Sequence, residues 1–300
     1  MNNDLYDIAI IGAGPAGLSA ALYARRANLK IVLIEKSAPG GKLLSISKIN
    51  NYPGYVGDDG ASLALNMYEQ VMKFNPEFIF DEVLDVNKNE DGLFNLKTNT
   101  TTIISKNVIV AVGTANENLK VARENNFIGK GISYCATCDG KFYEGKDLAV
   151  LASNEHGFEE TIYLKTFANK IYLLTDDNFD NSDFKEKILN ENIDVIKNVK
   201  ISKLLGEDKI EGVVLSDGKE LKIDGIFPLN NSLPINTFLK RYPDIFASNG
   251  YVKVNEKMET SIAGLYAIGD VNFHDLKQVV TACNDGAIAS QAIITKRFRK

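Results

Sequence analysis

The stretch "YDIAIIGAGPAGLSAALYARRANLKIVLIE", residues 6–35, decides the fold of the chain. It opens with an apolar strand over 6–11, which runs into a glycine-rich turn. An alanine-rich helix then reaches about Ala27, and a second apolar strand over 30–34 ends at Glu35. Strand, helix and strand in this order predict a complete βαβ unit.

The turn of this unit has the spacing of a dinucleotide-binding loop. Gly12 permits the tight bend, Gly14 lets the backbone approach a pyrophosphate, and Gly17 allows the helix to pack closely on the strand. The helix then directs its amides and its dipole at the phosphates. Glu35 stands at the end of the next strand, where an acid accepts hydrogen bonds from both ribose hydroxyls. A glycine pattern alone is a weak signal, but in this frame it predicts a dinucleotide site.

A second frame of the same kind begins near Asp147, with a strand over 148–151, a helix over about 155–167 and a strand over 170–174. Two nucleotide-domain frames therefore follow one another, and this internal repeat is the strongest indication of how the chain is organised. The rest of the chain is predicted to contain a hairpin over 78–99 around Glu90-Asp91-Gly92, strands at 107–112, 200–205, 210–215, 220–223 and 264–268, and a long helix over 278–294.

Length and composition exclude several classes of protein. The chain has 300 residues, 45% of them hydrophobic, which suffices for two medium cores. The formal charge of −5 gives no electrostatic footprint for nucleic acid, and the basic end "KRFRK" is typical of a solvated helix terminus. No apolar run approaches the ~20 residues of a membrane span, and the start "MNNDLYDIAI" has no basic region before its apolar run. These features predict a cytoplasmic globular protein with no nucleic-acid and no membrane partner.

Three cysteines are too few for a disulfide scaffold, and two of them form the pair Cys135-Ala-Thr-Cys138. A Cys-x-x-Cys pair can form a disulfide and can make a thiolate available near neutral pH. Asp139 follows directly, where an acid can exchange a proton with the departing or attacking sulfur. The alternative is half of a zinc site, but no second closely spaced pair of ligands accompanies it. The other cysteine and the histidines are Cys283, which we expect to be a buried small side chain, His156 and His274.

With these motifs in place, the chain resembles the low-molecular-weight thioredoxin reductase family. The resemblance spans essentially the whole chain, in the order of the family's motifs. It implies an α/β fold of two nucleotide-binding, Rossmann-like domains, each built in three ββα layers. The segments that carry the resemblance are "IGAGPAGLSAALYA" (11–24), "GGKLLSISKINNYPG" (40–54), "CATCDG" (135–140), "YAIGDV" (266–271) and "KQVVTACNDGAIAS" (277–290).

The resemblance also implies that one domain is inserted into the other. A discontinuous FAD domain would comprise residues 1–114 and 243–300. Between its two parts, a central domain over 115–242 would carry the cysteine pair and a degenerate NAD(P)H-binding fold. The family's architecture further implies a homodimer, and a rotation of the central domain about the strands near Thr114 and Pro243 that exposes the cysteines.

By the family pattern, the Cys135–Cys138 disulfide accepts electrons from reduced FAD and passes them to thioredoxin by exchange. Cys138 would lie nearer the flavin, and Asp139 would complete the catalytic set. Asp270 would bond the ribityl or pyrophosphate part of the FAD, and the helix after Gln278 would point its N-terminus at the flavin ring. The full set of expected FAD contacts is Gly12, Gly14, Pro15, Ala16, Gly17, Glu35, Lys36, Gly41, Lys42, Leu43, Asn51, Leu84, Gly113, Asp270, Lys277, Gln278 and Val279.

The second βαβ frame departs from the family. There the family binds NADPH through consecutive glycines after the strand, whereas this chain has Ala152, Ser153 and Asn154. The backbone can no longer approach a pyrophosphate without displacing three side chains.

A second departure lies at the end of the following strand. The family has a His-Arg-Arg segment there for the 2′-phosphate of NADPH, and this chain has Thr175, Asp176 and Asp177. At ~6 Å and an effective dielectric constant of ~20, one charge pair is worth roughly 3 kcal/mol, and each ~1.4 kcal/mol is a factor of ten in affinity. Two anions in place of cations therefore predict very poor NADPH binding. NADH escapes the phosphate argument but still meets the altered turn.

If the pyridine nucleotide is excluded, electrons must enter by another route. A flavin accepts one electron at a time, so a small iron–sulfur protein is a natural donor. In this respect the chain resembles the ferredoxin-dependent flavin thioredoxin reductases of anaerobic bacteria such as clostridia, and we expect ferredoxin to be its donor.

Three alternatives stay open. An NAD(P)H-dependent thioredoxin reductase with a remodelled nucleotide loop is the first. A ferredoxin–NADP reductase on the same fold is disfavoured, because it would have no use for the cysteine pair. A non-catalytic sensor, in which flavin and disulfide report the redox state to a partner, belongs to a different class and predicts no turnover with thioredoxin.

Overall fold

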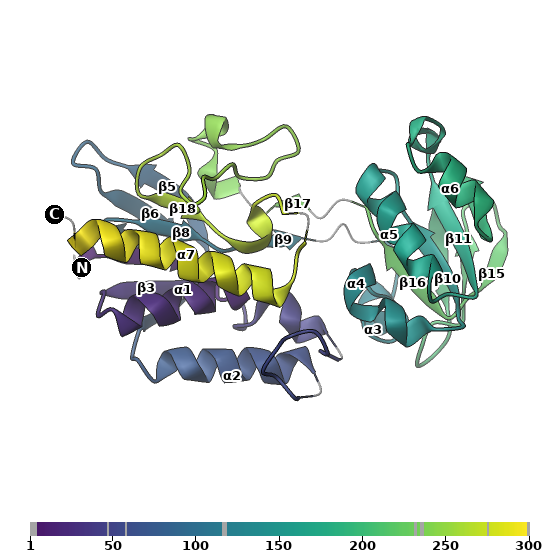
Figure 1. Cartoon of the computed structure of the whole chain (residues 1–300), viewed down its shortest axis with the longest axis horizontal. Coiled ribbons are helices and arrows are strands. Elements are labelled where there is room, and N and C mark those ends of the chain that lie inside the picture. The colour runs from purple at the N-terminus through teal and green to yellow at the C-terminus, as the bar shows by residue number, and fades with distance from the viewer. Residues whose placement is uncertain are drawn as a thin grey trace. The chain divides into compact units, whose positions relative to one another are not determined.

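The chain divides into two compact units, as a computed structural model shows (Figure 1). Unit 1 comprises Met1–Ala115 and Leu233–Lys300, and unit 2 comprises Asn116–Ser232. The short strands β9 (Thr114–Ala115) and β17 (Leu233–Pro234) pair antiparallel where the chain leaves unit 1 and returns to it. The return thus lies before Pro243, the start we expected for the second part of the FAD domain. The structure describes residues 5–46, 48–57, 59–115, 119–230, 233–234, 237–274 and 276–298.

The central layer of unit 1 is a parallel sheet of five strands in the order β18-β8-β2-β3-β4. Because all its strands run in one direction, the turns after their carboxyl ends meet at one edge, which is where ligands bind in such sheets. The strands are β18 (Leu265–Ala267), β8 (Val108–Val110), β2 (Ile8–Ile11), β3 (Ile31–Glu35) and β4 (Glu77–Phe80).

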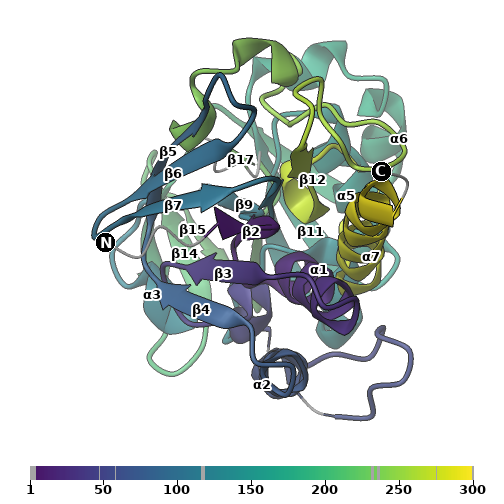
Figure 2. The ribbon, with the colours of Figure 1, turned by 90° about the vertical axis from the view of Figure 1, so that its left-hand side faces the viewer.

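Helices cover one face of this sheet. Figure 2 shows α1 (Pro15–Arg26) and α7 (Val279–Phe298) side by side, with α2 (Gly60–Met72) beyond α1. Ile8 and Ile10 of β2 face this helical layer, because side chains alternate along a strand. The last two residues of the basic end, Arg299 and Lys300, lie outside the described residues.

A second sheet covers the other face, against which Ala9 and Ile11 of β2 pack. Its order is β1-β7-β6-β5, and every residue of β2 is buried between the two layers. Unit 1 therefore has the three ββα layers that the sequence predicts. The strands of the second sheet are β1 (Leu5–Tyr6), β5 (Val83–Lys88), β6 (Phe94–Thr98) and β7 (Thr102–Ser105).

Unit 2 repeats this plan around a parallel sheet of four strands. Its parallel sheet has the order β12-β11-β10-β16 and carries helices on one face and the antiparallel sheet β13-β14-β15 on the other. The strands are β10 (Asp147–Leu151), β11 (Lys170–Thr175), β12 (Ile193–Lys197), β13 (Ile201–Leu205), β14 (Gly212–Leu215), β15 (Glu220–Lys222) and β16 (Gly225–Pro228). The helices are α3 (Glu124–Phe127), α4 (Ala136–Asp139), α5 (Glu155–Lys165) and α6 (Lys185–Asn190).

Several elements differ from the sequence prediction, among them β7, β12, β16 and α6, which the sequence did not indicate. The hairpin over 78–99 is shorter than predicted, because Phe78 to Phe80 belong to β4 and pair in parallel with β3, so that only β5 and β6 form the hairpin. The helix α2 was not predicted. Asp59 caps it by accepting from the amide of Ser62. Among the described residues, no helix has the length and apolar character needed to cross a membrane.

Candidate functional site

The glycine-rich turn after β2 is built partly by the chain's own packing. Gly12 has φ of +102°, and a Cβ there would lie 2.5 Å from the carbonyl oxygen of Ala111. A Cβ at Gly17 would lie 1.9 Å from the carbonyl oxygen of Gly12. Side chains cannot be accommodated at such distances, so these two glycines are required for the fold of the turn itself.

Gly14 is different. Its φ is −73°, which any residue adopts, and an added Cβ would meet nothing within 4 Å. Nothing in the packing of the protein explains a glycine here, whereas a phosphate that approaches the backbone does. The first turn of α1 carries no acid and no side-chain cap, so its amides and dipole are available to an anion. The turn therefore fits the pyrophosphate of FAD.

Glu35 lies beside this turn at the end of β3. Its Oε2 accepts from the amide of Ala13 at 2.8 Å and its Oε1 from the amide of Ser37 at 2.9 Å. The next residue, Lys36, lies 3.3 Å from the carboxylate of Glu82. Leu84, two positions after Glu82, is exposed on β5. The structure thus fixes the acid next to the glycine-rich turn.

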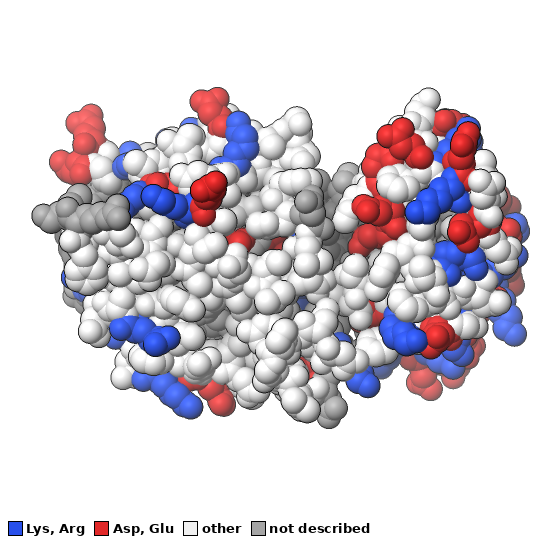
Figure 3. All heavy atoms as spheres, in the orientation of Figure 1, with Lys and Arg blue, Asp and Glu red and all other residues white. Residues whose placement is uncertain are grey.

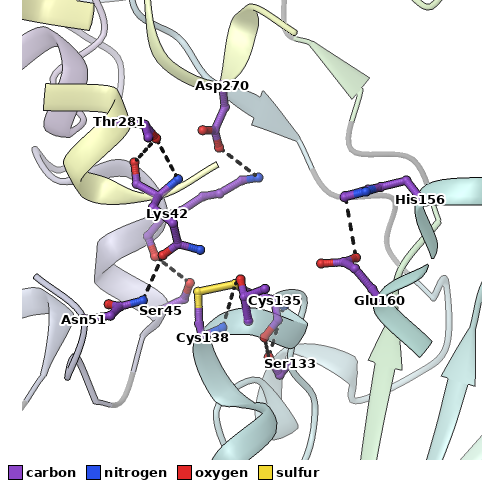
Figure 4. The surroundings of a disulfide bond; sticks show 12 residues. Lys42, Ser45, Asn51, Ser133, Cys135, Cys138, His156, Glu160, Asp270 and Thr281 are labelled. Atoms are coloured by element: carbon purple, nitrogen blue, oxygen red, sulfur yellow. Dashed lines mark hydrogen bonds and ion pairs between the residues drawn. A yellow bond between two sulfur atoms is a disulfide. The ribbon is translucent and has the colours of Figure 1, made fainter. Parts of the chain in front are cut away.

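The segment that contains Lys42 folds back onto the same turn. Gly40 donates its amide hydrogen to the carbonyl of Ala13 at 2.9 Å. Lys42 donates to Oγ1 of Thr114 at 2.7 Å, and its Nζ lies 3.7 Å from Oδ2 of Asp270 (Figure 4). Burial lowers the pKa of Lys42, the ion pair with Asp270 opposes this, and the charge of Lys277 adds to the lowering. The sequence did not indicate the contact with Thr114.

The other predicted contacts gather at this edge as well. Asn51 donates to Oε1 of Gln278 at 2.9 Å, which joins two segments far apart in the sequence. Lys277 donates to the hydroxyl of Tyr251. Gly113, with φ of +65°, follows β8, and Leu43 is buried in a small cluster beneath α2. Pro15 and Ala16 open α1, and Val279 begins α7.

The redox pair of unit 2 is a disulfide between Cys135 and Cys138 (Figure 4). Cys135 precedes the short helix α4, and its Sγ accepts from the amide of Cys138 at 3.2 Å. The amide of Cys135 donates to Oγ of Ser133 at 3.2 Å. The backbone thus holds the sulfur of Cys135 at the start of a helix, where amide dipoles favour a thiolate once the disulfide opens.

Asp139 follows Cys138 directly in the chain and ends α4. Its Oδ1 is buried and has no hydrogen-bond partner within the described part of the chain. Burial raises the pKa of this carboxyl, and a hydrogen bond with Ser133 opposes the rise. A carboxyl that keeps its proton to higher pH than usual can protonate a departing thiolate.

Glu124, which the sequence did not indicate as important, holds the segment that precedes the disulfide. Glu124 is buried on α3 and accepts from the amides of Leu119 at 2.9 Å and Lys120 at 3.2 Å. It also accepts from the hydroxyl of Tyr134, the residue before Cys135. Nothing in the local sequence distinguishes this glutamate from a surface residue.

The turn after β10 aligns with the turn after β2, position by position. Ala152, Asn154 and Gly157 stand where Gly12, Gly14 and Gly17 stand in unit 1. The packing glycine is kept, since a Cβ on Gly157 would lie 2.7 Å from the Cβ of Ala152. Asn154, by contrast, occupies the phosphate position and caps α5, because its Oδ1 accepts from the amide of Gly157 at 2.9 Å. The chain's own side chain thus takes the amide that a phosphate would use.

The carboxyl ends of the neighbouring strands are likewise linked to one another. Ser153 donates to Oδ1 of Asn230 at 3.1 Å, across the ends of β10 and β16. Asn178 donates to the carbonyl of Ser153 and, through its backbone amide, to Asp176 at 3.0 Å. Asp177 accepts from the side chain of Asn198 at 3.1 Å. Buried Thr175 ends β11.

Comparison with known proteins is consistent with this geometry. A family model described as "Pyridine nucleotide-disulphide oxidoreductase" matches residues 6–286. The thioredoxin reductase of Ureaplasma parvum is 36% identical over 298 residues, which cover 97% of this chain and 96% of that protein. The structure of thioredoxin reductase from Streptococcus pyogenes has a TM-score of 0.90 at 35% identity and covers 100% of both chains. A ferredoxin-flavin thioredoxin reductase from Clostridium acetobutylicum has a TM-score of 0.55 at 30% identity and covers 99% of both chains.

Proposed function

The chain belongs to the pyridine nucleotide-disulphide oxidoreductase family as a thioredoxin reductase, and we propose that it takes its electrons from reduced ferredoxin and not from NADPH. As a member of this family it binds FAD, whose ring accepts electrons singly or in pairs. The residues gathered around Gly14 and Asp270 would hold the FAD. The thioredoxin disulfide would then be reduced by exchange with the cysteine pair of unit 2.

The observation that carries the donor proposal is the contrast between the N-termini of α1 and α5. The α1 terminus has no side-chain cap and no acid in its first turn. The α5 terminus is capped by Asn154 and carries Glu155 in its first turn. An anionic pyrophosphate is therefore favoured at α1 and opposed at α5.

The negative charge of acidic residues around α5 also opposes the binding of a nucleotide. Glu155 and Glu159 are exposed on this helix, and Asp176 stands at the end of β11. Figure 3 shows carboxylates on the part of unit 2 that carries α5. Each unfavourable charge pair at ~6 Å is worth roughly 3 kcal/mol before screening by salt. These groups repel the phosphates of either pyridine nucleotide.

Ferredoxin is an energetically sufficient donor. A ferredoxin near roughly −400 mV that reduces a thioredoxin near roughly −270 mV gains ~130 mV, or ~6 kcal/mol for two electrons. The printed name of the Clostridium acetobutylicum relative includes ferredoxin, which supports the proposal. Ferredoxins are usually acidic, so docking requires basic side chains. Lysines and arginines stand singly or in small groups on the face shown in Figure 3.

The competing function is an NAD(P)H-dependent thioredoxin reductase. The family model that matches the chain is named for a pyridine nucleotide, which favours this alternative. It requires that the self-capped turn after β10 open when the nucleotide arrives, at the cost of the Asn154 cap, about 1 kcal/mol.

We also propose a homodimer and a cytoplasmic location. Membership of the family supports both proposals. A disulfide that must open in each turnover is typical of catalytic cysteines in a reducing compartment.

An anaerobic titration tests the donor. In the purified yellow protein, we expect reduced ferredoxin to bleach the flavin band near roughly 450 nm and thioredoxin thiols to appear. NADPH and NADH at about 100 μM should leave the band unchanged over minutes, because a loss of several kcal/mol raises the dissociation constant by orders of magnitude. Dithionite serves as the positive control for flavin reduction. Rapid bleaching by micromolar NADPH would establish the competing function instead.

The glycine-rich turn gives a matched pair of variants. Gly14→Ala should leave the thermal unfolding of the FAD-free protein nearly unchanged, because its Cβ meets nothing within 4 Å, yet weaken FAD binding by about 10-fold or more, which corresponds to ~1.4 kcal/mol. Gly17→Ala should destabilise the fold, because its Cβ would lie 1.9 Å from a carbonyl oxygen. FAD fluorescence titration and a melting curve measure the two effects. Equal FAD affinity in Gly14→Ala and the wild type would exclude the turn as the phosphate site.

A further inference from the structure

Asp285 is a buried acid that none of the proposed steps uses. It lies on α7, among alanines and glycine, and is 1% exposed. A carboxylate at such a position costs free energy unless it is hydrogen-bonded, so its partners indicate its role.

Both partners of Asp285 lie on the loop that contains Asp270. The Oδ2 atom of Asp285 accepts from the amide of Gly269 at 2.9 Å and lies 2.8 Å from Nε2 of His274. Gly269 opens the short helix η6 (Gly269–Val271), which contains Asp270. One buried oxygen therefore holds the loop on both sides of Asp270.

The loop is pressed against the helix that begins the FAD site. A Cβ on Gly269 would lie 2.9 Å from the Cβ of Ala16, in the first turn of α1. Asp270 in turn forms the ion pair with Lys42. Any loosening of the loop would therefore move Asp270 away from the first turn of α1.

We propose that Asp285 and His274 are positioning residues for FAD, which together form a clamp that holds the 269–274 loop against α1. The clamp rests on the proposed assignment of Asp270 to the FAD site. Neither residue takes part in the electron transfer. His274 is only partly exposed, at 27% of its side chain, and it reaches Asp285 from the surface of the loop.

The clamp should depend on pH. The groups that face His274 are Asp285 on α7, Asp270 on η6 and Lys277 before α7. The hydrogen bond to Asp285 raises the pKa of His274 above 6.5, the charge of Asp270 adds to the rise, and burial and Lys277 oppose it. For a raised histidine pKa, the stabilisation is fully present below about 6.5, the pKa in the unfolded chain, and is lost as the pH rises through the folded value. The loop is therefore held less firmly at alkaline pH, and FAD binding should weaken with it.

The chain has two histidines, which makes the test direct. In holoenzyme labelled with ¹³C at histidine Cε1, the variant His156→Gln has only one labelled signal, that of His274. We expect this signal to titrate above pH 6.5 and to shift towards 6.5 when Asp285→Asn is added. His156 is exposed at 62% of its side chain, so its replacement should leave FAD binding unchanged.

FAD affinity supplies the second readout. We expect His274→Gln and Asp285→Asn to weaken FAD binding by about 10-fold at pH 6, and His274→Gln to remove the alkaline weakening of the wild type. His274→Gln leaves the buried core intact and so keeps the test valid if Asp285→Asn fails to fold. If both variants keep the wild-type affinity while Gly14→Ala weakens it, the FAD site is correct and the clamp is wrong. If Gly14→Ala is also without effect, the assignment of the FAD site itself has failed.

Discussion

Cys135→Ser and Cys138→Ser are each expected to abolish thioredoxin reduction, down to the uncatalysed background. Exchange requires that one sulfur attack the substrate disulfide and that the other release the mixed disulfide, and a serine oxygen can do neither. The flavin of both variants should still be reduced by the electron donor, because the residues proposed to hold FAD belong to unit 1 and the disulfide belongs to unit 2. Thiol release from thioredoxin and flavin absorbance, followed in parallel, measure the two halves of the reaction.

Cys283→Ser is the matched control for these variants. Cys283 lies on α7, partly buried beside Tyr52, and should tolerate the change with activity close to that of the wild type. A thioredoxin that lacks its second cysteine and carries thionitrobenzoate as a mixed disulfide on the first should form a protein–protein disulfide, with release of the thionitrobenzoate thiolate, with only one of the two single variants, which identifies the attacking sulfur. Turnover in either Cys135→Ser or Cys138→Ser would show that electrons leave the flavin by a path other than this disulfide.

The sequence predicts the two βαβ units well because their signals are local. In both, the apolar strand, the turn and the helix are adjacent in the chain, and β2, α1 and β3 lie within a residue or two of the predicted ranges. The five-stranded sheet is harder to predict, since its order brings β18 beside β8 and β4 beside β3. The residues of β4 share the alternating pattern of a hairpin strand, so the sequence predicts a hairpin there and not the pairing with β3.

The same contrast between local signals and long-range contacts applies to the candidate site. Of the residues with a family motif, Lys42 bonds to Thr114 and pairs with Asp270, and Asn51 bonds to Gln278. The sequence did not indicate that Asp285 is buried, because an acid in an alanine-rich helix has the same local sequence whether it is buried or exposed. Only the packing of α7 on α1 buries it and brings it to Gly269.

Only part of the altered turn after β10 could be predicted from the sequence. The loss of the glycines was visible in the sequence, and so was the reversal of charge at Asp176 and Asp177. That Asn154 caps α5, and that Ser153 bonds to Asn230, required the three-dimensional structure. The polar groups of the turn form hydrogen bonds with one another and with the neighbouring strand end, so the turn has a structure of its own and is not simply a nucleotide-binding turn without its glycines.

Asp139→Asn is expected to slow the reduction of thioredoxin by about 10²-fold or more, the usual contribution of a general acid or base. Opening the Cys135–Cys138 disulfide produces a thiolate that must be protonated, and Asp139 is the adjacent carboxyl. Burial raises its pKa, so the carboxyl keeps its proton to higher pH than an exposed aspartate. Asparagine has nearly the same shape but no proton to give. Single-turnover kinetics with reduced flavin measure the step without interference from the donor.

The pH profile distinguishes a proton donor from a structural residue. The wild-type rate should fall as the pH rises through the pKa of Asp139, while the Asn variant should be slow on both sides of it. Tyr143 cannot substitute, because burial and then the charge of Asp139 raise its pKa to about 12, which makes it too weak an acid to protonate a thiolate, since the pKa of an ordinary thiol is about 8.5. Glu144→Gln, an exposed change on the same segment, should keep the wild-type profile. If Asp139→Asn also keeps that profile, the proton reaches the sulfur from solvent and the buried carboxyl has only a structural role.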